Sequence, residues 1–206
     1  FLMNSFNQEI FKYLKIVQPV IIFDIGSYKG NFSRNLNKKL NLPKKNFYLF
    51  DSNPNLKIDD FNYFNETFSN KIKISNFHFN NFFPSSGSSL KNIIKRDKIW
   101  NFSRKLITFN FNSNFTTFKV KTNTLDNFCK KKKINKIDLL KIDVEGSELD
   151  ILIGGKNILK NTNIIHLEVL ETKKHFHKKK NKIIDLLKKY NFKLKKDKSI
   201  LSVSIL

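Results

Sequence analysis

Short apolar runs alternate with polar, amphipathic segments along most of the chain. Residues 20–24 (VIIFD), 46–51 (NFYLFD), 137–143 (IDLLKID) and 163–169 (NIIHLEV) are nearly continuous apolar runs. Strands that are buried on both faces of a parallel sheet show this pattern. We therefore predict a strand at each of the four positions. A further strand is expected at 71–79 (KIKISNFHF), where apolar and polar residues alternate.

The segments between these runs carry helical signals. Apolar residues recur at helical spacing, or capping residues precede them, in segments 4–17, 30–41, 124–131, 147–160 and 181–190. Thr124 is placed to cap the third of these helices. Residues 106–121 alternate more weakly and predict an extra hairpin over the sheet. The tail, residues 192–206, reads as a hairpin around Asp197.

Repeated alternation of strand and helix predicts an α/β fold. The expected architecture is a mostly parallel central sheet with helices on both faces, finished by a C-terminal antiparallel hairpin. A chain of 206 residues fits one domain, so we predict a single unit over 1–206, with an N-terminal helix over 1–18 leading into it. The sequence leaves the oligomeric state open.

The composition is strongly basic, with 39 Lys and Arg against 17 Asp and Glu and a formal net charge of +22. Such a charge normally suggests a nucleic-acid partner. However, Ala is absent while Lys, Asn, Ile and Phe are all abundant, and these four are encoded by A/T-rich codons. Codon drift therefore explains much of the charge, and nucleic acid is the disfavoured partner.

A reducing compartment is indicated by the cysteine content, because Cys129 is the only cysteine. We read it as a small buried apolar side chain. No apolar run has the length of a membrane span, and the first residues lack the apolar core of a signal peptide. These features predict a cytoplasmic protein without a membrane span.

Acidic residues end the predicted parallel strands. Asp24 and Asp51 end the first two, Asp143 ends the strand at 137–143 with Glu145 close behind, and Glu168 lies at the end of the next. Ligands of open parallel sheets bind outside the carboxyl ends of the strands. Acids are scarce in this chain, so their accumulation at one sheet edge predicts a binding site there.

The first strand is followed by a glycine-containing turn, GSYKG, at residues 26–30. Gly26, Ser27 and Gly30 let the backbone approach a ligand, and the following helix offers free N–H groups to an anion. Asp24 would repel a pyrophosphate. S-Adenosylmethionine, which has an ammonium for Asp24 and a carboxylate for the helix, fits better, and Asp51 is placed to accept hydrogen bonds from its ribose hydroxyls.

Residues 125–159 resemble the signature of the FkbM-type methyltransferase family, in which a TLD segment leads to a strand reading KIDVEG and then a helix. VIIFDIGSYKGNFS, FYLFDSNP, SSGSSL and NIIHLEV follow in that family's order, so the resemblance covers most of residues 20–170. It implies a class I Rossmann-like methyltransferase fold, S-adenosylmethionine as cofactor, and O-methylation of a sugar, glycan or other small molecule. The positions of its glycine loop and ribose acid fall on Asp24, Gly26, Gly30 and Asp51. The family usually has Glu where this chain has Asp51.

Methyl transfer to a hydroxyl requires alignment of the acceptor and removal of its proton. Asp143 or Glu145 is the candidate base, Lys141 is placed to hold a carboxylate ionised or to orient the acceptor, and Glu168 faces the same crevice. No metal is expected, although Asp143 and Glu168 leave a hard divalent cation such as Mg²⁺ as an open alternative.

Several other polar residues have structural explanations. Glu148 and Asp150 suit the start of a helix, with Ser147 and Asp150 as a capping box. His166 is read as a structural strand residue, and the segment around His175 and His177 as a solvated basic loop. Residues 85–89 form a Ser/Gly loop, for which an acceptor contact is the less favoured interpretation.

Two other functions remain open at this stage. An RNA 2′-O-methyltransferase would use the basic charge, with Asp143 in its catalytic constellation, but the other members of that constellation cannot be placed. A non-catalytic, Rossmann-like module that binds polyanions would also use it. The family resemblance favours the small-molecule or glycan methyltransferase.

Overall fold

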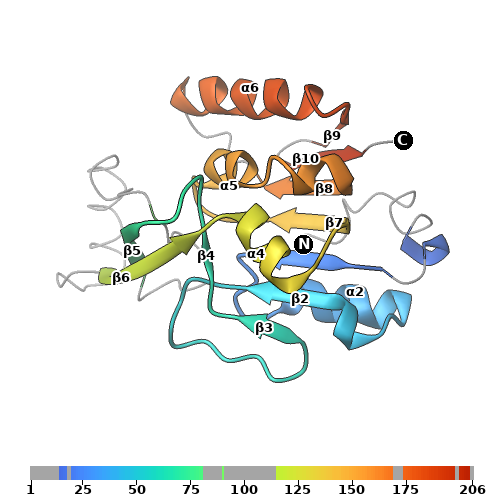
Figure 1. Ribbon diagram of the computed structural model, residues 1–206, viewed down its shortest axis with the longest axis horizontal. Coiled ribbons are helices and arrows are strands. Elements are labelled where there is room, and N and C mark those ends of the chain that lie inside the picture. The colour runs from blue at the N-terminus through green and yellow to red at the C-terminus, as the bar shows by residue number, and fades with distance from the viewer. Residues whose placement is uncertain are drawn as a thin grey trace, which may run out of the picture.

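The computed structural model describes residues 14–17, 20–80, 90, 115–168, 174–197 and 200–204. Its strands form a seven-stranded sheet of order β3-β2-β1-β7-β8-β10-β9 and a three-stranded sheet of order β4-β6-β5. Figure 1 shows the main sheet as a stack with β3 at the bottom and β9 at the top. The α/β architecture expected from the sequence is therefore confirmed, with a second sheet added to it.

Five strands of the main sheet run parallel to one another. In spatial order they are β3 (Asn62–Phe64), β2 (Phe47–Phe50), β1 (Ile22–Ile25), β7 (Ile137–Ile142) and β8 (Thr162–Glu168). Every residue of β1 and β7 is buried, which explains why these strands read as continuous apolar runs.

Helices cover both faces of this sheet. On one face, α2 (Asn31–Leu40) packs Leu36 and Leu40 against Ile22, Leu139 and Ile164 of the strands. The other face carries Phe23, Leu140 and Ile165, which pack under three helices. These helices are α4 (Leu125–Lys132), α5 (Glu148–Gly154) and α6 (Lys174–Lys188).

The C-terminal hairpin is also confirmed. β9 (Lys193–Asp197) and β10 (Ile200–Ser204) pair antiparallel, and β10 pairs antiparallel with β8. The returning strand is thus inserted between β8 and β9. The hairpin completes the edge of the sheet next to β8.

The expected strand at 71–79 does not belong to the main sheet. β5 (Ile74–Asn80) pairs antiparallel with β6 (Phe115–Asn123), and β4 (Thr67–Phe68) pairs parallel with the other end of β6. The alternation of the segment corresponds only in part to a buried face, because Phe77 is 6% exposed whereas Ile72 and Ile74 are 51% and 65% exposed. The third strand of the main sheet is instead β3, too short to give a pattern.

Of the hairpin predicted for 106–121, residues 106–114 lie outside the described part, and residues 115–121 belong to β6 of this small sheet. β5 and β6 lie beyond the ends to which the arrowheads of β2 and β7 point (Figure 1). The second sheet therefore stands at the carboxyl edge of the main sheet, where ligands of parallel sheets bind.

The helix predicted for 147–160 is broken in two. It ends at Gly154 and is followed by a 3-10 turn, η3 (Ile158–Asn161). A Cβ on Gly154 would lie 2.2 Å from the carbonyl oxygen of Ser69, so glycine allows the segment after β4 to cross the helix closely.

The predicted basic loop around His175 and His177 needs correction, and most of the predicted N-terminal helix lies outside the described part. The basic segment with His175 and His177 is not a loop but the first turn of α6, because Lys is a good helix former and no breaker precedes residue 181. Of the predicted N-terminal helix, only residues 14–16 are described as helical, and residues 1–13 lie outside the described part.

The TLD segment joins α4 to the turn η3. Thr124 caps α4 as predicted, with its hydroxyl accepting the N–H of Asn127 at 3.2 Å. The Asp126 carboxylate accepts the N–H groups of Asn157 and Ile158, the latter at 2.9 Å. These N–H groups begin η3 and would otherwise have no helical partner.

We expect Asp126→Ala to lower the free energy of unfolding by about 1–3 kcal/mol, because the partly buried N–H of Ile158 and the exposed N–H of Asn157 lose their acceptor. Urea denaturation measures the change. Asp185→Ala is the matched control, since Asp185 is an exposed acid on α6. Equal losses in the two variants would contradict a role for Asp126 in joining α4 to η3.

Candidate active site

The predicted acids meet at a reversal in strand order. Counted along the chain, the parallel strands of the main sheet lie in the order third, second, first, fourth, fifth, so the order reverses between β1 and β7. Chain connections leave in opposite directions at this switch point, which opens a crevice at the carboxyl ends. Asp24 lies in β1, and Asp143 directly follows β7.

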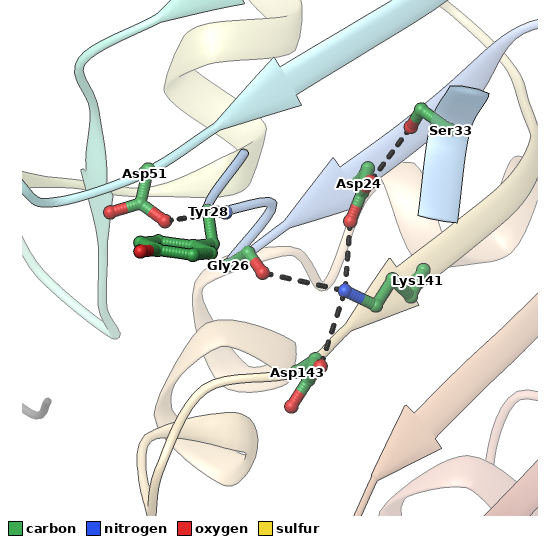
Figure 2. Close-up of polar contacts among 7 residues, drawn as sticks. All are labelled: Asp24, Gly26, Tyr28, Ser33, Asp51, Lys141 and Asp143. Carbon is green, nitrogen blue, oxygen red and sulfur yellow. Dashed lines mark hydrogen bonds and ion pairs between the residues drawn. The ribbon is translucent and has the colours of Figure 1, made fainter. Parts of the chain in front are cut away.

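A buried ion pair joins the two strands at this point. Lys141 Nζ lies 2.9 Å from Asp24 Oδ1, with side-chain exposures of 6% and 0%. Ser33, on α2, donates its hydroxyl to Asp24 Oδ2 at 2.7 Å. Lys141 also contacts the carbonyl oxygen of Gly26 at 3.4 Å and Asp143 Oδ2 at 3.3 Å (Figure 2). One ammonium therefore connects β1, the glycine loop and the end of β7.

The carboxylates keep this lysine charged. Burial lowers the pKa of Lys141, but the attraction of Asp24 and Asp143 more than reverses that effect, so its pKa is raised above the ordinary value. The ammonium also lies 5.4 Å from the ring centre of Phe32. Each oxygen of Asp24 has a partner and its side chain is 0% exposed, so Asp24 supports the glycine loop from the protein interior.

Close packing of the glycine loop against β7 requires Gly26. Its φ is +77°, and a Cβ there would lie 1.9 Å from the carbonyl oxygen of Asp143. Gly30 also has a positive φ, +73°, and a Cβ there would lie 2.9 Å from Leu49 Cδ2. The two glycines of the predicted loop are thus required both by backbone conformation and by space.

The glycine loop leads directly into α2, whose N-terminus is not capped by a side chain. Gly30 is the N-cap of α2, and no described side chain caps the helix or places an acid in its first turn. The hydroxyl of Ser27 is one of three buried polar side-chain atoms without a hydrogen-bond partner among the described residues. A ligand carboxylate would satisfy both kinds of donor.

Asp51 lies beside this loop, as predicted. Its Oδ2 accepts the N–H of Tyr28 at 2.8 Å, and its Oδ1 accepts the N–H of Asn53 at 2.9 Å. Burial raises the pKa of Asp51, and these two hydrogen bonds oppose the rise. A carboxylate has about four acceptor positions, so two remain for hydroxyl groups of a ligand.

The turn after β7 is held at both of its ends. At its start, Asp143 donates its N–H to Ile25 at 2.9 Å. At its end, Glu148 accepts the N–H of Gly146 at 2.7 Å, while Lys179 of α6 donates to the carbonyl oxygen of Gly146 at 2.6 Å and pairs with Glu148. Glu145 lies between these fixed points and is half-buried.

These contacts correct the predicted capping box. Ser147 is the N-cap of α5, but its side chain makes no capping hydrogen bond, and the Glu148 carboxylate turns back to Gly146 instead. Lys179 was not identified from the sequence, because it lies in a basic run and its partners are more than 30 residues away. Only tertiary packing brings it to the turn.

His166 packs beneath the same site as a structural residue. It lies opposite Lys141 in the sheet register, is 2% exposed, and stacks on Phe32 with ring centres 6.1 Å apart. Burial and the neighbouring Lys141 lower the pKa of His166 to about 4, with Asp143 opposing them. The imidazole is therefore neutral at neutral pH.

Two predicted regions stay untested. The backbone places Glu168 at the end of β8, but its side chain lies outside the described part, as do residues 85–89.

Among the residues that the structure describes, no group of three or more His, Cys, Asp or Glu side chains can hold a metal ion. None of the described helices is long and apolar enough to cross a membrane.

A cavity of about 630 Å³ adjoins the Asp51 segment. Its lining includes Pro54 after β2, Asn65 and Glu66 after β3, and parts of β6 and α4. Asn65 connects it to the site, because its side chain donates to the carbonyl oxygens of Asp51 and Asn53 at 3.0 and 2.9 Å. The volume is in the range of small-ligand pockets.

The strand order, the glycine loop and the acid at the end of β2 are consistent with a Rossmann-like methyltransferase fold. The family model of the methyltransferase FkbM domain matches residues 24–194. The chain therefore belongs to the FkbM methyltransferase family, as the sequence motifs indicated.

The chain is 27% identical over 178 residues to the 2-O-methyltransferase NoeI of Sinorhizobium fredii (strain NBRC 101917 / NGR234). The matched region covers 79% of this chain and 68% of that relative. No solved structure matches the chain significantly.

We expect Lys141→Met to lower the free energy of unfolding by about 3–5 kcal/mol, because Asp24 would remain buried without its cation. Adding Asp24→Asn should recover part of this loss. Chemical denaturation of the single and double variants measures both effects. The control is Lys156→Met, at an exposed lysine. A loss no larger than that of the control would show that the pair does not hold the strands.

Acid should destabilise the protein partly through His166. Its pKa is about 4 in the folded state against an ordinary 6.5, so the folded state binds fewer protons between these values than the unfolded state does. The free energy of unfolding should therefore fall as the pH drops from 6.5 to 4, by on the order of 3 kcal/mol from this group. His166→Gln should flatten this part of the pH profile in urea denaturation. Parallel profiles for the two proteins would contradict the assignment.

Proposed function

We propose that this protein is an S-adenosylmethionine-dependent O-methyltransferase that methylates a hydroxyl of a sugar, glycan or other small molecule. The observation that carries the proposal is the meeting of an uncapped helix N-terminus, a glycine loop and Asp51 at the carboxyl ends of β1 and β2, next to the switch point of the sheet. The name of the relative NoeI, a 2-O-methyltransferase, supports a hydroxyl as the acceptor.

The residues present fit this cofactor. Its carboxylate would lie at the start of α2, where no side chain caps the helix, and would accept the unpaired hydroxyl of Ser27. Its ribose hydroxyls would donate to the remaining acceptor positions of Asp51. Gly26 and Gly30 keep the loop close enough for these contacts, and the cavity next to Asp51 leaves room for the adenine.

Asp24 belongs to the site in a supporting role. Its carboxylate holds Lys141 and Ser33, so it fixes the loop and α2 from behind. The cofactor ammonium expected near Asp24 would lie on the other side of the loop, next to backbone carbonyl groups. The ammonium would then be attracted to Asp24 electrostatically, across the loop, without direct contact.

When bound, the cofactor supplies a methyl group that is already activated on a sulfonium. The protein has to place the acceptor oxygen in line and take its proton. Asp143, with a side chain 35% exposed, and Glu145 lie at the carboxyl end of β7 and are the proposed acceptors of that proton. Lys141 fixes the orientation of Asp143, and Glu168, at the end of the next strand, completes the proposed acceptor site.

Calorimetric titration with S-adenosylmethionine tests the cofactor. We expect saturable binding to the wild-type protein and no measurable binding to Asp51→Ala, because the ribose hydroxyls lose their acceptor. Asp59→Ala is the matched control, since it removes an exposed carboxylate from the same loop. A folded wild-type protein that does not bind the cofactor would refute the proposal. Transfer of label from methyl-labelled cofactor to saccharides of a host extract then tests the acceptor class.

A further inference from the structure

The glycine loop contains a third left-handed residue, and this residue is not glycine. Tyr28 has φ +46°, between Gly26 at +77° and Gly30 at +73°. An aromatic side chain in this region is strained, because its Cβ crowds the backbone. Gly or Asn would adopt the same backbone at lower cost. The loop therefore keeps a strained tyrosine where a simpler residue would fit.

Hydrogen bonds around the loop impose this conformation. Gly26 and Ser27 donate their N–H groups to the carbonyl oxygen of Phe50 at 2.9 and 3.0 Å, and Gly30 donates to Ser27 at 2.8 Å. Between these bonds, the N–H of Tyr28 points to Asp51 Oδ2. All of these are backbone donors, so any non-proline residue at position 28 preserves them. The aromatic ring itself adds nothing to the loop's hydrogen bonding.

The Tyr28 ring lies near the carboxylate that is proposed to hold the ribose of the cofactor. Figure 2 shows the Tyr28 ring beside the Asp51 carboxylate, with Asp51 at the end of one strand and the glycine loop at the end of the next. The side chain is half-buried, and Lys29 Nζ lies 5.6 Å from the ring centre. A ribose held by Asp51 would therefore have an aromatic wall next to it.

We propose that the Tyr28 ring is a wall of the nucleoside site and determines the affinity for the cofactor by contact with its ribose and adenine. This inference rests on the proposed function, since it requires a nucleoside cofactor at Asp51. It explains the strain: the backbone cost at Tyr28 is offset when a ligand packs against the ring. The loop's own hydrogen bonds hold this backbone, but any non-proline residue would keep them, so they do not explain the choice of a tyrosine.

Substitution at position 28 should separate stability from binding. Tyr28→Asn and Tyr28→Gly relieve the left-handed strain and remove the ring. We expect their thermal midpoints to be no lower than that of the wild type, while the Kd for S-adenosylmethionine rises about tenfold. Tyr28→Phe, which keeps the ring, should bind within about twofold of the wild type. Calorimetry and thermal unfolding measure the two quantities.

Lys133 supplies the matched control. It also has a positive φ, +56°, but at the C-terminal cap of α4, where a left-handed residue is a normal helix end. Lys133→Gly should raise the thermal midpoint and leave cofactor binding unchanged. A tenfold loss of affinity in this variant would show that relief of backbone strain, and not loss of a ring, weakens binding.

S-Adenosylhomocysteine distinguishes the part of the ligand that the ring contacts, because it has the same nucleoside but no sulfonium charge. Equal weakening of both ligands by Tyr28→Asn supports a nucleoside wall. Selective weakening of S-adenosylmethionine would assign the ring to the cation and overturn the proposal.

The remaining outcomes are also decisive. Wild-type affinity in Tyr28→Asn, or failure of both ring-free variants to fold, overturns this inference alone. Absence of binding in the wild type refutes the proposed function and this inference with it.

Discussion

The buried pair of Asp24 and Lys141 is the interaction on which the site depends. Two charges removed from water must each be fully paired, because an uncompensated buried charge costs several kcal/mol. Asp24 meets this requirement with Lys141 and Ser33, and Lys141 meets it with Asp24, Gly26 and Asp143. The pair therefore fixes α2, β1, the glycine loop and β7 relative to one another.

The two most distinctive sequence motifs, DIGSYKG and KIDVEG, pack directly against each other. DIGSYKG supplies a loop without a side chain at Gly26, and KIDVEG supplies the Asp143 carbonyl oxygen that occupies that space. The N–H of Asp143 in turn bonds to Ile25. Because the backbones are in direct contact, the acids that follow them have little freedom of position, which is what a site for aligned methyl transfer requires.

Local patterns predicted the parts of the fold that local physics determines. Continuous apolar runs identified the central strands, and Thr124 identified a helix start, because each depends on neighbouring residues in sequence. The strand pairing of β5 with β6, the ion pair of Lys179 with Glu148 and the positive φ of Tyr28 depend on contacts distant in sequence or on loop geometry. Residue types alone do not encode them, so they were missed or misplaced.

Segment 136–150 keeps several acids although acids are scarce in this chain of charge +22, and their hydrogen bonds explain why. Asp138 is 1% exposed and accepts the N–H of Ile21 and the side-chain amide of Asn163, each at 2.9 Å. Glu148 accepts the N–H of Gly146, and Asp143 pairs with Lys141. A lysine cannot accept a hydrogen bond, so replacement of these acids by the residue most favoured by the composition would leave backbone donors unpaired. Codon drift can make the surface basic, but residues such as Asp138 and Glu148, which accept hydrogen bonds from the backbone of neighbouring segments, must remain acids or amides.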